Sequence, residues 1–168
     1  MFEYRVTQYD PCTRDHNGRY PGDEWTSWSR VGERVGDRLL SIQDYWKVED
    51  ALVIAAVHML SESGVDSLNV CGLENGTNYV PETFDLREGT VLAGNQLQHA
   101  LRCLLREYFW CRLEGDEGAY IHVGRDLCLY VGVPRPVPET LRTVQAAGLF
   151  VDTFPSLFTA TSRGEQPN

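Results

Sequence analysis

The chain is short of basic charge, and it is almost without lysine. Of its 168 residues, 24 are Asp or Glu and 15 are Lys or Arg, with Lys47 the one lysine, so the formal net charge is −9. An acidic protein repels the phosphates of nucleic acids and of anionic membranes. The charge balance therefore argues against nucleic-acid and membrane binding, and it favours a basic protein partner or none.

Motifs of the common enzyme classes are also missing. The sequence contains no Gly-x-Gly-x-x-Gly, no phosphate-binding loop and no Gly-x-Ser-x-Gly, which excludes the most frequent nucleotide-binding and hydrolase classes. No Cys-x-x-Cys occurs, and the four histidines lie far apart in the sequence, whereas a zinc site needs three or four ligands. We therefore expect neither a metal nor a cofactor.

The five cysteines do not fit a disulfide framework, because their number is odd. Cys103, Cys111 and Cys128 lie in apolar runs, where a reduced cysteine behaves as a small hydrophobic residue. The opening residues lack the basic and apolar regions of a signal peptide, and no apolar run is long enough to span a bilayer. These features together predict a reduced, cytoplasmic protein.

Hydrophobic periodicity predicts the element order β-α-β-α-β-β-β-α-β. Ser41 and Asp44 resemble a capping box at the start of the strongest helix, and Gly64 ends that helix. The expected helices are 41–63, 92–108 and 139–147, and the expected strands are 2–9, 65–73, 109–114, 120–123, 127–133 and 149–154. Both long helices have a single apolar stripe, which predicts an α+β two-layer sandwich with both helices on one face of a mixed or antiparallel sheet.

The length is typical of one domain, which we expect to span residues 1–158, followed by a loose tail at 159–168. Residues 10–40 have weak periodicity and are rich in Gly, Arg, Asp and Trp, with at most a short helix over 24–30. Irregular segments of this length are uncommon and often functional.

Alternation along the predicted strands sorts their side chains onto two faces. The purely apolar set should face the helices, and the outer face should then carry Trp110, Arg112, Tyr120, His122, Cys128 and Tyr130. Aromatic residues and arginine are enriched in binding hot spots, so this face is a candidate binding surface. Alternatively, segment 10–40 covers it and docks its own Trp25 and Trp28 there.

A run of carboxylates and indoles at residues 23–29 is a candidate for acid or base chemistry. Apolar indoles can raise the pKa of a neighbouring carboxyl group such as that of Glu24. A simpler interpretation is that Asp23 or Ser27 caps a short helix while Trp25 and Trp28 anchor the loop.

Two cysteine–histidine pairs are the other candidates for chemistry. Cys128 shares the outer face with His122, so the two could form a nucleophile and its base. His99 and Cys103 are spaced i, i+4 on one helix, but they supply only two metal ligands. The alternative for this second pair is a histidine that is exposed to solvent and a cysteine that is buried, with no metal bound.

Four stretches resemble a family of small uncharacterised bacterial proteins: MFEYRVTxYDP at the start, DEWTS at 23–27, GLEN at 72–75 and FWCRLE at 109–114. The resemblance spans most of the chain and implies a soluble, single-domain bacterial protein, but it implies no catalytic role. In size and acidity the chain is also similar to immunity proteins, which neutralise secreted toxins.

The leading hypothesis from the sequence is a non-enzymatic cytoplasmic binding protein, such as an immunity or antitoxin protein for a basic toxin. The first alternative is an enzyme or small-ligand-binding protein with a pocket between segment 10–40 and the sheet. The second alternative is a structural homo-oligomer that buries its aromatic face.

Overall fold

A single seven-stranded sheet organises the computed structural model, which describes residues 1–15, 27–35, 37–124 and 127–156. The strand order is β5-β4-β6-β7-β8-β1-β9, and every neighbouring pair is antiparallel. The strands are β1 (Phe2–Thr7), β4 (Ser67–Glu74), β5 (Val91–Ala93), β6 (Trp110–Glu114), β7 (Tyr120–Val123), β8 (Cys128–Val133) and β9 (Phe150–Thr153). A separate hairpin joins β2 (Arg34–Val35) to β3 (Arg38–Leu39).

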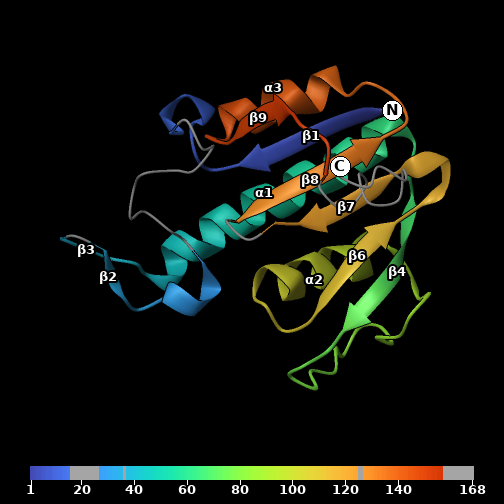
Figure 1. Cartoon of the computed structure of the whole chain (residues 1–168), viewed down its shortest axis with the longest axis horizontal. Coiled ribbons are helices and arrows are strands. Elements are labelled where there is room, and N and C mark those ends of the chain that lie inside the picture. The colour runs from blue at the N-terminus through green and yellow to red at the C-terminus, as the bar shows by residue number, and fades with distance from the viewer. Residues whose placement is uncertain (16–26, 36, 125–126, 157–168) are drawn as a thin grey trace, which may run out of the picture.

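Helices α1 (Ile42–Ser63) and α2 (Gly94–Leu105) lie on the same face of this sheet, behind the strands in Figure 1. The third helix, α3 (Pro138–Ala146), packs against α1 and β9. The side chains between the layers form one apolar core drawn from the sheet and all three helices. The predicted α+β sandwich is confirmed, and its sheet is antiparallel.

The bounds of α1 follow from its own sequence. The Ser41 hydroxyl accepts a hydrogen bond from the backbone N–H of Asp44 (3.1 Å), and the Asp44 carboxylate accepts one from the Ser41 N–H (3.4 Å). These reciprocal bonds satisfy N–H groups that the first helical turn leaves unpaired. Gly64 ends the helix in the left-handed conformation, at φ 80°. Within the described residues, no helix is both long and apolar enough to cross a bilayer.

The second helix is shorter than predicted. Leu92, expected at its start, lies in β5 and is buried opposite Leu68 of β4, because pairing with β4 overrides the local helical pattern. The helix ends at Leu105, and Glu107 adopts a positive φ of 60° that cannot continue it. In the expected short helix at 24–30, a single 3₁₀ turn covers Trp28–Arg30, and residues 24–26 lie outside the described part of the chain.

A bulge in β4 shapes the sheet face that points away from α1 and α2, which we call the outer face. The register between β4 and β6 shifts between Cys71 and Glu74, and Gly72 has a φ of 64°. The Glu88 carboxylate accepts hydrogen bonds from the backbone N–H groups of Gly72 and Leu73, at 2.8 and 2.9 Å. It thereby satisfies donors at the bulge, and these two bonds lower the pKa of Glu88.

Candidate functional site

The structure places the predicted sheet residues on the outer face. Along β6, Cys111 and Leu113 are buried toward the helices, so Trp110 and Arg112 point outward. Between β7 and β8, His122 lies opposite Tyr130. Between β6 and β4, Arg112 lies opposite Cys71. Alternation therefore predicted the face correctly, but burial divides this face into two halves.

One half of the outer face is covered by residues 154–156, which follow β9. The side chains of Tyr120 and His122 are only 3% and 1% exposed, and their rings stack 4.4 Å apart. The Ser156 hydroxyl lies 2.7 Å from His122 Nδ1, and the Ser156 N–H donates to the Tyr120 hydroxyl at 3.2 Å. Phe154 packs over Tyr130, with 6.0 Å between ring centroids.

The expected open face therefore needs correction for this half, while part of segment 10–40, the alternative cover, lies outside the described residues, at 16–26 and 36. Tyr120 and His122 are too deeply buried to contact a partner directly. Among the described residues, Phe154 and Ser156 contact this half, because β9 pairs with β1 at the sheet edge and the chain then turns across the outer face. Cys128 is also buried, at 8% exposure.

The other half of the outer face, formed by β4 and β6, is more exposed. We call it the open half, and it consists of Cys71, Glu74, Trp110, Arg112 and Glu114. Glu74 lies opposite Trp110 in the register, so both side chains are on the same face. The Arg112 guanidinium lies 2.9 Å from the Glu114 carboxylate, and the two side chains are 31% and 38% exposed. This half therefore carries a half-buried indole beside charged groups that are partly or fully exposed.

His122 is unsuited to the role of a general base. Burial, together with the nearby Arg112 guanidinium, lowers the pKa of His122 to about 4. Efficient general bases have a pKa near the working pH, so at pH 7 this imidazole is neutral but a weak base. Its approach to Glu114, at 3.6 Å from Nε2, is accordingly not an ion pair at neutral pH.

We expect His122 to make the protein less stable as the pH falls from 7 to 5. Its pKa is about 4 in the folded protein and near 6.5 when unfolded. The unfolded state therefore binds more protons in this range, and unfolding becomes easier by about 2 kcal/mol. Urea denaturation at the two pH values measures the effect. His122→Phe should remove most of this difference, and an unchanged difference would contradict the assignment.

Trp28 is not on the outer face but on the helix side of the sheet. Its ring meets those of Tyr45 and Tyr108 edge-on, with centroids 5.2 and 6.2 Å away. The Arg106 guanidinium lies 5.2 Å from its centroid. Trp28 thus anchors its segment to α1 and to the residues that follow α2, rather than to the predicted binding surface. Trp25 and the candidate acid Glu24 fall outside the described residues.

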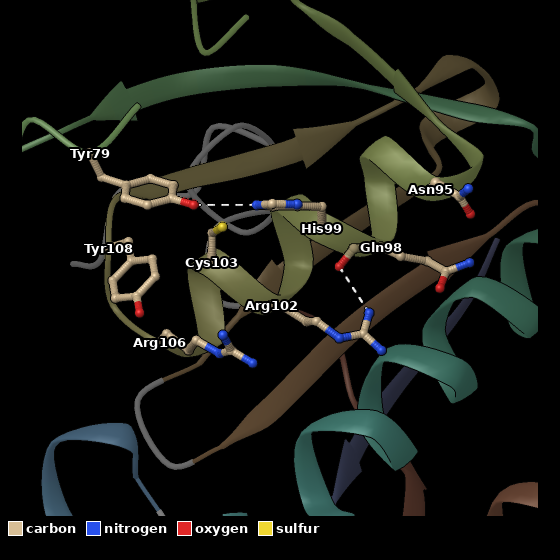
Figure 2. A pocket seen from close by; sticks show the side chains of 8 residues that line it. All are labelled: Tyr79, Asn95, Gln98, His99, Arg102, Cys103, Arg106 and Tyr108. Atoms are coloured by element: carbon tan, nitrogen blue, oxygen red, sulfur yellow. Dashed lines mark hydrogen bonds between the residues drawn. The ribbon is translucent and has the colours of Figure 1, made fainter. Parts of the chain in front are cut away.

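A hollow of about 520 Å³ beside α2 was not predicted from the sequence. We call it the α2 hollow, and Figure 2 shows the residues that line it: Tyr79, Asn95, Gln98, His99, Arg102, Cys103, Arg106 and Tyr108. In Figure 2, Tyr79 and His99 point toward one another, with 3.3 Å between the Tyr79 hydroxyl and His99 Nε2. The Cys103 thiol lies close to this pair, and burial raises its pKa.

Two carboxylates of α1, one buried and one exposed, hold the arginines of the α2 hollow in place. Glu49 on α1 is 1% exposed, and its two oxygens accept hydrogen bonds from Nε and Nη2 of Arg106, both at 2.7 Å. Arg102 donates from Nη2 to the Asp50 carboxylate at 2.8 Å. The bonds to Glu49 raise the pKa of Arg106 above its already high ordinary value, so Arg106 stays positively charged.

One sequence signal could have pointed to this arrangement. Glu49 is the one charged residue in the apolar stripe of α1, and a buried carboxylate requires a cationic partner. Arg102 and Arg106, spaced i, i+4 on the next helix, are such partners. The loop that contributes Tyr79 had no pattern from which its position could be predicted.

His99 and Cys103 do share one wall of the α2 hollow, as their spacing predicted. In the described part of the chain, no group of three or more His, Cys, Asp or Glu side chains is arranged to hold a metal ion.

Comparison of the chain with protein-family models, with curated protein sequences and with solved structures finds no match. The resemblance to small bacterial proteins therefore rests on its four short stretches of sequence alone.

Proposed function

We propose that this protein is a non-enzymatic, cytoplasmic binding protein that recognises a basic protein, and that it serves as an immunity protein against a basic toxin. The observation that carries the proposal is the net charge of −9, combined with a sheet face on which the glutamate Glu74 lies opposite the tryptophan Trp110. Opposite charges accelerate the encounter of two proteins, and desolvated aromatic side chains then supply much of the binding energy.

The open half is the surface that we propose for this contact. Within it Glu74 is exposed, Glu114 is partly exposed and Arg112 is the one cation, and Glu88 is exposed beside it. Trp110 lies directly across from Glu74. A lysine or arginine of the partner could pair with these carboxylates while its alkyl chain packs on the indole.

Loss of the indole should weaken binding without unfolding the protein. We expect Trp110→Ala to reduce affinity for the partner by about 2 kcal/mol, or roughly 30-fold, as for other aromatic hot spots. The matched control is Trp46→Ala, because Trp46 is 43% exposed and lies on α1, in the helical layer. Binding is measured by calorimetry against the basic toxin that a pull-down from the native host is expected to recover, and thermal melting checks the fold.

Charge reversal tests the electrostatic part of the proposal separately. Glu74→Lys should lower the association rate, and added salt should lower the rate of the wild type in the same way.

In cells, expression of the wild type should permit growth in the presence of the toxin. Equal survival with Trp110→Ala and Glu74→Lys combined would show that the open half is not the contact surface.

A further inference from the structure

We propose that the α2 hollow binds a small organic anion through its carboxylate or phosphoryl group. The lining contains two arginines, a histidine and two side-chain amides, and it contains no Asp or Glu. This reverses the balance of the whole chain, in which 24 acidic residues exceed 15 basic ones. A concentration of N–H donors in a concave site suits an oxyanion.

The geometry of the arginines supports this assignment. Glu49 holds Arg106 through Nε and Nη2, which leaves Nη1 and its two N–H groups outside that ion pair. Arg102 donates a hydrogen bond from Nη2 to the Asp50 carboxylate. Its Nη1 makes a long contact of 3.4 Å with the Gln98 carbonyl. Neither carboxylate lines the α2 hollow, and through these bonds they orient the donors before a ligand arrives, which lowers the entropic cost of binding.

The size and the walls of the α2 hollow suit an organic anion better than a bare inorganic ion. A volume of about 520 Å³ lies within the usual range for sites that hold organic ligands. Tyr79 and Tyr108 form an aromatic wall at one end, with ring centroids 4.6 Å apart. An anion with a flat or apolar body therefore fits better than inorganic phosphate, because that body can pack on the tyrosines.

The experiment is a titration of the isolated protein followed by NMR, with phenyl phosphate and benzoate as the two probes. We expect at least one probe to shift the backbone N–H signals of His99 and Cys103, which the variants below retain, saturably and with a Kd of about 1 mM or tighter. The better probe distinguishes a phosphoryl ligand from a carboxylate ligand. Benzylamine, which has a similar ring but the opposite charge, should not bind.

Two variants make the result specific to the α2 hollow. Arg102→Gln should weaken binding of the better probe at least about tenfold, and Gln98→Glu should do the same by adding a negative charge to the lining. Arg87→Gln is the control, because Arg87 is 75% exposed and pairs with Asp85 away from the α2 hollow.

Shifts that stay linear up to about 10 mM of both anions would overturn the proposal, since affinity would then be too weak for a site. Equal affinity in Arg102→Gln and the wild type would also overturn it, as would equal binding of benzylamine. The titration contains no partner protein, so its outcome is independent of toxin recognition by the open half.

Discussion

Replacement of Arg106 by alanine is expected to destabilise the protein by about 3 kcal/mol, because it leaves a buried carboxylate without its partner. Glu49 is 1% exposed, and both of its oxygens bond to Arg106 at 2.7 Å. Arg102 remains nearby, but its Nε is 3.8 Å from Glu49, too far to replace those bonds. The change also removes the cation that lies over the Trp28 ring.

Urea denaturation measures this loss, and two further variants test its cause. Arg102→Ala should cost less than about 1 kcal/mol, because its pair with Asp50 is exposed to solvent. The double variant Glu49→Leu with Arg106→Met should recover most of the stability, since apolar residues of similar size often replace a buried ion pair without loss. A double variant no more stable than Arg106→Ala would show that packing, and not the unpaired charge, causes the effect.

Leu101→Ala should cost about 2–5 kcal/mol, the range found for other buried leucines. Leu101 is fully buried on α2, in the core between the helices and the sheet. Its truncation removes apolar contacts and leaves a cavity that a close-packed interior cannot fill completely. Denaturant unfolding of wild type and variant gives the difference directly.

The control for this variant is Leu39→Ala, because Leu39 is 53% exposed on the β2–β3 hairpin. It should change stability by less than about 0.5 kcal/mol. A similarly small loss for Leu101→Ala would contradict the placement of α2 against the core.

Local patterns in the sequence were enough to predict the elements and the direction of their side chains. Ser41, Asp44 and Gly64 define both ends of α1, since capping depends only on residues within a turn of each other. Alternation assigned Trp110 and Arg112 to the outer face for the same reason, because it is a property of each strand by itself. Where the local pattern was ambiguous, at Leu92, pairing with a distant strand decided the outcome.

The sequence by itself thus determined the α+β class, the acidic charge and the division of the sheet into an apolar and a mixed face. Only the tertiary structure decided which side chains on the mixed face reach solvent, because Ser156 covers His122 from 34 residues away. It alone also brought Glu49 to Arg106, across 57 residues, and so fixed one arginine that lines the α2 hollow. Burial and ion pairing depend on contacts between segments far apart in the chain, and periodicity within a single helix or strand contains no information about them.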